Sequence, residues 1–191
     1  MEEVCDDLFT DIAVHLNGTN CYRLSCMSKR YNRLVYEVQH LSVRKSVKLN
    51  RFVRLKSLYS FVQIPLDISH LTNLVTLGLD NYFISDISSL TGLTCLGLGY
   101  PSSVVDISML TNLRKLSLHN PYGVKDISML TNLTELDISG NRMISDLSNL
   151  INLTKLNISG CRYFRLRKGK LIKLNGNIEE IVELPNLKSD S

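Results

Sequence analysis

The sequence has no long apolar run and no cysteine pattern typical of a metal site or a disulfide framework. No stretch approaches the roughly 20 consecutive apolar residues that a membrane-spanning helix needs. The 5 cysteines include no C-x-x-C pair, which disfavours both a disulfide scaffold and a zinc ribbon. The acidic start MEEVCDDLFTD lacks the basic and apolar segments of a signal peptide. We therefore expect an intracellular protein, cytoplasmic or nuclear, that is neither secreted nor bound to a membrane.

Catalytic motifs are also missing from the sequence. It contains neither a P-loop nor a G-x-G-x-x-G string. The 4 histidines are scattered, and the sequence implies no serine and acid arrangement around any of them. We expect a protein that is not an enzyme and that holds no cofactor and no metal ion.

What the chain contains instead is a repeat. The string DISMLTNL occupies residues 106–113 and again 126–133, and related strings begin at Asp67, Asp86 and Asp146. A fixed period of about 20 residues indicates a solenoid, in which each unit packs on its neighbours. Such a fold more often provides a binding surface than a reaction site.

Each unit also carries an L-x-x-L-x-L core, as at Leu113, Leu116 and Leu118. This core is the leucine-rich-repeat signature, and its last two apolar positions alternate as in a strand buried on one face. A coiled coil would need a sustained period of about 3.5 residues, which a 20-residue step does not supply. The pattern predicts an α/β solenoid, a short leucine-rich-repeat horseshoe with a parallel β-sheet and with turns or extended segments on its convex side.

The aspartate that begins each unit is expected to begin a turn. Its carboxylate would accept hydrogen bonds from backbone N–H groups two and three residues further on. Cation binding is the alternative, but no second acid lies beside these aspartates. The asparagine that usually follows the strand is found only at Asn141, with Cys161 as its substitute, so we do not expect a continuous ladder there. The D-I-S-x-L and L-T-N-L strings resemble internalin-like repeats.

Strand alternation exposes one set of side chains on the sheet face, the concave face of the expected horseshoe. The set is polar and alternates in charge, so it suits a peptide of mixed charge whose register is fixed by complementarity. An ordinary solvated sheet face is the alternative. The predicted target-binding residues are Thr76, Asp80, Cys95, Lys115, His119, Glu135, Asp137, Lys155 and Asn157.

Aromatic residues follow the strands and form a second candidate surface, a rim of the horseshoe. Tyrosine is favoured at interfaces because it is large and amphipathic. Packing within the loops is the alternative. The rim residues are Tyr82, Tyr122 and Tyr163, within a wider set that adds Phe83, Tyr100 and Phe164.

The first 42 residues show helical spacing instead. Val4, Leu8, Ile12 and Leu16 recur every four residues, which predicts an amphipathic helix, and two shorter helices are expected to follow. These helices would either form a separate domain or cap the open end of the solenoid.

The strings VCDDLFTDIAVHL and CYRLSCMSKRYNRLV resemble an F-box over about residues 4–42. Cys5 stands where that family usually has proline, and Tyr31 where it has tryptophan. The resemblance implies an N-terminal three-helix F-box-like part that docks a Skp-type adaptor. Followed by repeats, it implies the substrate-recognition subunit of a Skp–cullin–F-box ubiquitin ligase, in which the repeats bind an unidentified target protein. The implied adaptor-binding residues are Val4, Leu8, Phe9, Ile12, Leu24 and Met27.

A composition break near residue 66 supports a division of the chain. We assign residues 1–42 to the F-box-like helical domain and 43–66 to a degenerate first repeat or linker. Residues 67–165 are the leucine-rich repeats, and 166–191 are a divergent C-terminal repeat and cap.

Two other functions remain open. One is a scaffold or structural component of a larger assembly with no ligase link. The other is nucleic-acid binding through the basic runs, which we disfavour because alternating charges also guard the edge of a sheet.

Overall fold

The computed structural model describes residues 40–43, 49, 54–60, 65–119, 122–167, 170–175, 178–182 and 184–187. Residues 1–39 of the predicted three-helix part, which include all of its adaptor-binding residues, lie outside these ranges. Among the described residues, none forms a helix long and apolar enough to cross a membrane.

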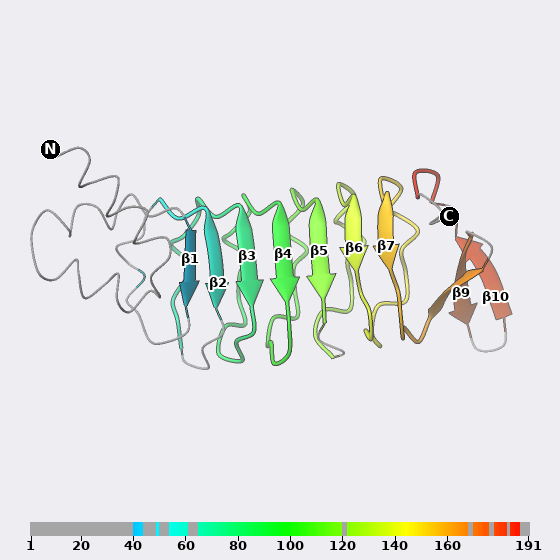
Figure 1. Ribbon diagram of the computed structural model, residues 1–191, viewed down its shortest axis with the longest axis horizontal. Helices are drawn as coiled ribbons and strands as arrows, with labels where there is room; N and C mark the ends of the chain where they lie inside the picture. The colour runs from blue at the N-terminus through cyan, green and yellow to red at the C-terminus, as the bar shows by residue number, and fades with distance from the viewer. Residues whose placement is uncertain are drawn as a thin grey trace, which may run out of the picture.

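Seven short strands lie side by side in chain order and form one parallel sheet (Figure 1). This order is that of a solenoid, because each strand pairs with the strand of the next unit and no strand is skipped. The parallel-sheet solenoid predicted from the repeats is therefore confirmed. The strands are β1 (His40–Val43), β2 (Ser57–Ser60), β3 (Thr76–Leu79), β4 (Cys95–Leu98), β5 (Lys115–Leu118), β6 (Glu135–Asp137) and β7 (Lys155–Asn157).

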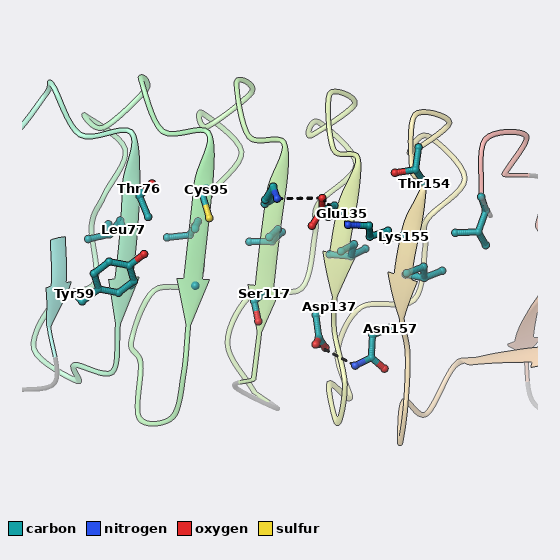
Figure 2. A pocket seen from close by; sticks show the side chains of 18 residues that line it. Tyr59, Thr76, Leu77, Cys95, Ser117, Glu135, Asp137, Thr154, Lys155 and Asn157 are labelled. Atoms are coloured by element: carbon teal, nitrogen blue, oxygen red, sulfur yellow. Dashed lines mark hydrogen bonds and ion pairs between the residues drawn. The ribbon is translucent and has the colours of Figure 1, made fainter. Parts of the chain in front are cut away.

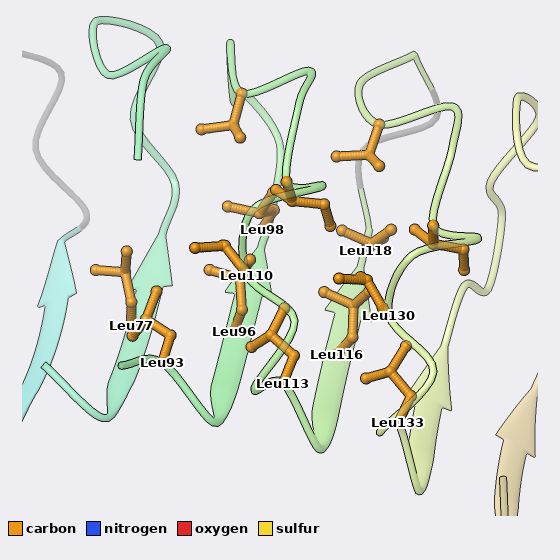
Figure 3. Packing of buried hydrophobic residues seen from close by; sticks show 14 of the residues in the cluster. Leu77, Leu93, Leu96, Leu98, Leu110, Leu113, Leu116, Leu118, Leu130 and Leu133 are labelled. Carbon is orange, nitrogen blue, oxygen red and sulfur yellow. The ribbon is translucent and has the colours of Figure 1, made fainter. Parts of the chain in front are cut away.

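Equivalent positions of successive units pair with each other. Leu96 pairs with Leu77 on one side and with Leu116 on the other. Because side chains alternate along a strand, one face of the sheet receives all of these leucines. The opposite turns add further leucines, such as Leu113 and Leu133, and these pack against the strand leucines in one buried core (Figure 3).

The D-I-S-x-L-T-N-L strings form tight turns opposite the sheet. The Leu71 N–H donates to the Ile68 carbonyl at 3.0 Å, and the Leu74 N–H donates to the Leu71 carbonyl at 3.0 Å. The other units repeat this pair of bonds. The convex side therefore consists of turns, as expected for so short a repeat.

All five aspartates begin their turns as predicted. In each case the carboxylate accepts the backbone N–H of the serine two residues further on, at 2.8–3.0 Å. Bonds from backbone N–H groups lower the pKa of the Asp86, Asp106 and Asp126 carboxyls. The repeated aspartates thus act as local turn formers.

The asparagine of L-T-N-L forms a ladder that the sequence analysis did not anticipate. The Asn112 side-chain amide donates to the Thr91 carbonyl at 2.9 Å, and Asn132 donates to Thr111 at 3.0 Å. Asn152 repeats the bond to the Thr131 carbonyl at 2.9 Å. Each unit is thereby tied to the one before it through the carbonyl of the same turn position.

A second set of polar residues follows the strands, where the chain turns away from the sheet. Asn141 is buried, and its side-chain oxygen accepts the N–H groups of Met143 and Ile144 at 2.8 and 2.9 Å. Gly140 precedes it with φ of 72°, a left-handed conformation that suits glycine. Asn81 is also buried, and it accepts the Phe83 N–H at 2.7 Å. The prediction that only Asn141 fills this position is wrong. Asn81 lies three 20-residue steps before Asn141 (141 minus 81 is 60), but it follows the last strand leucine, Leu79, by two residues, whereas Asn141 follows Ile138 by three.

The sheet extends further toward the N-terminus than the clear repeats do. Leu55 and Leu58 are buried, and β2 pairs with β3 from Ser57 to Ser60, so a degenerate unit does precede Asp67 as predicted. β1 pairs with β2 and adds one more strand to the parallel sheet. The last residues of the F-box-like stretch therefore pair with the repeats.

At the C-terminal end, three strands form a separate antiparallel sheet in the order β10–β9–β8. They are β8 (Phe164–Arg167), β9 (Lys170–Asn175) and β10 (Ile178–Val182). After this sheet the chain returns to the stack, where the Leu187 N–H donates to the Leu184 carbonyl at 3.1 Å. Asn186 then donates to the Ile151 carbonyl at 2.9 Å, which continues the asparagine ladder. The final unit therefore contains the usual turn, preceded by an inserted three-stranded sheet.

Candidate functional site

A groove of about 750 Å³ crosses the sheet face from β2 to β7 (Figure 2). Its walls are the outward side chains of the strands, which the pairing register arranges in two parallel rows. Because the strands pair in register, equivalent positions of successive units lie next to each other across the sheet. The first row contains Thr76, Cys95, Lys115, Glu135 and Lys155, and the second contains Tyr59, Gly78, Gly97, Ser117, Asp137 and Asn157.

The end of the groove over β2–β4 is neutral. The Tyr59 ring lies over Gly78, where an added Cβ atom would stand 2.6 Å from the ring. Next to it, a Cβ atom at Gly97 would meet nothing within 4 Å, so the groove is open there. Cys95 lies beside this opening, and burial raises the pKa of its thiol. This end is a hollow bounded by an aromatic ring.

The end over β5–β7 is charged. The ammonium groups of Lys115 and Lys155 both lie 3.1 Å from the same Oε1 atom of Glu135. Hydrogen bonds from Lys115 and then Lys155 lower the pKa of the Glu135 carboxyl. The three side chains come from adjacent strands, so the ion pairs link β5, β6 and β7 across the face.

The second row contains a hydrogen-bonded aspartate on β6. Asp137 accepts the Asn157 amide at 3.0 Å and the Ser139 backbone N–H at 2.9 Å, and His119 Nε2 lies 3.7 Å away. Burial raises the pKa of the Asp137 carboxyl, but the bonds from Ser139 and Asn157 outweigh it, so the net shift is downward. The carboxylate is therefore held ionised and oriented.

Ser117, His119 and Asp137 lie together, an arrangement that the sequence analysis did not anticipate. The Ser117 hydroxyl is 3.4 Å from both ring nitrogens of His119. A working nucleophile and base usually approach to about 2.6–3.2 Å through one defined nitrogen. The three side chains therefore form a loose polar contact on the sheet face.

The structure places the predicted sheet-face residues as follows. Seven of them line the groove, namely Thr76, Cys95, Lys115, Glu135, Asp137, Lys155 and Asn157. The other two, Asp80 and His119, follow β3 and β5 and lie outside the lining.

Tyr59 and Leu187 are among the lining residues that the sequence analysis did not predict. Tyr59 lies one position after the core Leu58, so alternation extended into the degenerate unit would have placed it on the sheet face. Leu187 belongs to the L-P-N-L string, whose likeness to L-T-N-L was the available signal. Leu187 closes the groove beyond β7.

The rim residues separate into two groups. Tyr82 and Tyr122 are 63% and 65% exposed, and the Phe83 ring meets the Tyr82 ring edge to face at 6.1 Å. Tyr163 instead packs partly buried against the core, with the Arg162 guanidinium 5.5 Å from its ring centre. Phe164 is fully buried in β8. The exposed rim therefore consists of the aromatics that follow β3, β4 and β5.

No protein-family model matches this chain, and no curated protein matches its sequence. Among solved structures, an internalin of Listeria monocytogenes has a similar fold, with a TM-score of 0.55 and 25% sequence identity. The match covers 71% of this chain but only 45% of the internalin, less than half of that protein's length. The chain thus carries a leucine-rich-repeat solenoid resembling that of an internalin, a scaffold suited to protein–protein interaction.

Proposed function

We propose that the protein is a non-catalytic binding module whose sheet face holds a segment of a partner protein. The observation that carries this proposal is the groove across β2–β7, which combines an open hollow with fixed charges. Parallel strands hold these side chains on a rigid framework, so little conformational entropy is lost when a partner binds. The Ser117 hydroxyl lies 3.4 Å from both ring nitrogens of His119, a loose contact that we interpret as part of the polar binding face.

The proposed site is tested by filling the hollow. A Gly97→Trp variant places a large ring in the groove from a position where an added Cβ atom meets nothing within 4 Å, and circular dichroism checks that the variant folds like the wild type. The matched control is Lys125→Ala, an exposed residue of the turn side. Partners captured from host cells by the wild type and the control should be lost with Gly97→Trp, as quantified by mass spectrometry. Equal capture by all three proteins excludes the sheet face as the binding site.

A finer proposal concerns the N-terminal stretch. We propose that it docks a Skp-type adaptor, which would make the protein the substrate-recognition subunit of a ubiquitin ligase. Its support is the SKRYNRLV string at residues 28–35 and the leucine and isoleucine spacing before it.

The test is a pull-down with a purified Skp-type adaptor. Wild type should retain the adaptor, and a Leu8→Asp, Ile12→Asp double variant should not, with equal folding checked by circular dichroism. If both proteins bind equally or neither binds, the ligase role is excluded. A stable complex without any Skp or cullin subunit would instead favour a scaffold in a larger assembly.

We also propose an intracellular location. Cys95 and Cys161 are free thiols, and both are partly exposed. Free thiols persist in reducing compartments, whereas oxidising compartments favour disulfides. Immunofluorescence of the tagged full chain, expressed in its host, tests this location.

A further inference from the structure

The charged end of the groove is cationic at its outer surface, although its formal charges, two lysines and two acids, cancel. The side chains of Lys115 and Lys155 are 56% and 70% exposed, whereas Glu135 and Asp137 are only 32% and 34% exposed. The acids therefore lie lower on the face, and the ammonium groups stand above them. An approaching partner meets the lysines first.

The lysines also keep unused hydrogen-bonding capacity. Each ammonium group has three N–H donors, and within the described part of the chain each forms one ion pair, to Glu135. Because both groups bind the same Oε1 atom, they lie within about 6 Å of each other, and one carboxylate can accept bonds from both. Glu135 fixes the two lysines in this position before any partner arrives.

The neutral end has the opposite character. Among the described residues, β2, β3 and β4 contribute no charged side chain to the groove. The opening above Gly97 lies next to the Tyr59 ring, which suits an apolar or aromatic side chain. Gly97 and Glu135 are two strands apart across the sheet, about 10 Å, and two residues apart along the strands, about 7 Å, so they are about 12 Å apart.

We infer that the groove binds a protein segment with an acidic side chain over Lys115 and Lys155 and an apolar or aromatic side chain over Gly97. The two anchors are about 12 Å apart, and together they fix the direction of the segment across the sheet. This inference rests on the proposed function and adds the chemistry of the partner to it.

A nucleic acid is the other anionic ligand to consider, and the charge pattern disfavours it. A continuous phosphate backbone requires a run of cations. On this face the acidic side chains of Glu135 and Asp137 lie on the strand between those of Lys115 and Lys155 and would repel phosphate groups. A single carboxylate can meet both ammonium groups and avoid the two acids. A peptide with one acidic anchor therefore fits better than a polyanion.

The test begins with the full chain and a phage-displayed library of random short peptides. We expect the enriched peptides to share one aspartate or glutamate and one apolar or aromatic residue. A synthetic copy of an enriched peptide is then measured by fluorescence polarisation against the wild type and three variants. Gly97→Trp fills the hollow, Lys115→Ala with Lys155→Ala removes the cations, and Lys125→Ala with Arg142→Ala removes two exposed cations outside the groove.

The expected result is a loss of about tenfold or more in affinity for the first two variants and less than about twofold for the control. Raising the salt from about 0.15 M to about 1 M should weaken wild-type binding and leave the double-lysine variant almost unchanged.

Three results would overturn this inference. Peptides that are lost with Gly97→Trp but show no acidic preference would refute the acidic anchor and leave the proposed function standing. If no peptide is enriched, or if Gly97→Trp binds like the wild type, both proposals fail. Competition by a single-stranded oligonucleotide stronger than by the free peptide would assign the site to nucleic acid.

Discussion

The two sides of the solenoid follow different rules. On the turn side, made by the D-I-S-x-L-T-N-L strings, almost the same residues recur in every unit and make the same bonds to their neighbours. On the sheet face, the residue at a given position changes from unit to unit, as from Gly97 to Ser117 to Asp137. Repetition therefore marks the residues that hold the fold, and variation marks the residues that are free to serve binding.

The largest expected effect separates a core leucine from its sheet-face neighbour. Leu113 is fully buried, so Leu113→Ala should lower the free energy of unfolding by about 2–5 kcal/mol. Lys115→Ala, two residues further on and exposed, should change it by no more than about 0.5 kcal/mol. Urea denaturation followed by circular dichroism measures both values. Equal losses would mean that the sheet face also holds the fold.

The next effect concerns the buried Asn141. Asn141→Ala leaves the N–H groups of Met143 and Ile144 without their side-chain acceptor, which should cost about 1–3 kcal/mol. Asn112→Ala removes one exposed ladder bond and should cost about 0.5–1.5 kcal/mol. Urea denaturation gives both values, and the reverse order would show that the exposed ladder matters more than the turn after the strand.

Acid should act on the turn side through the aspartates. The folded-state pKa values of Asp86, Asp106 and Asp126 are lowered, so their contribution is complete above the unfolded pKa of about 3.9. This contribution to stability is lost as the pH falls through the lowered pKa values of the folded protein. A triple Asp→Asn variant keeps an oxygen acceptor in each turn but cannot titrate. Melting temperatures measured down to about pH 2 should fall less steeply for the variant, and parallel curves would refute the assignment.

The smallest effect on stability is expected within the groove. Glu135→Gln removes the charge that holds Lys115 and Lys155, but the pairs are exposed, so the cost should stay within about 1 kcal/mol. Urea denaturation again provides the measurement. A loss as large as that of Asn141→Ala would show that the ion pairs also build the fold.

Most of the fold follows from periodicity. The leucine spacing predicted the strands, the buried face and the parallel order, because these depend only on which positions repeat. The L-P-N-L string escaped because it lies out of strict period, after an insertion. Asn81 escaped because it follows its strand leucine, Leu79, by two residues, one fewer than separate Ile138 from Asn141. A pattern of residues predicts neighbours in space only where the number of residues per turn stays constant.

The groove was harder to predict than the core. Alternation correctly gave the outward positions, but it says nothing of how far a side chain reaches or which partner it meets. That Lys115 and Lys155 share one oxygen of Glu135 depends on rotamers that the sequence does not specify. The open space above Gly97 depends likewise on the position of the Tyr59 ring over the next strand.

The asparagine ladder has a consequence for how this chain can grow. Asn152 and Asn186 are 34 positions apart in the sequence (186 minus 152), yet they occupy successive steps of the ladder. The sheet β8–β10 fills the difference without displacing the next step. The stacking of these two turns therefore does not require the usual 20 residues of chain between them. We expect that a further domain inserted between β7 and the turn at residues 184–187 would leave the sheet face unchanged.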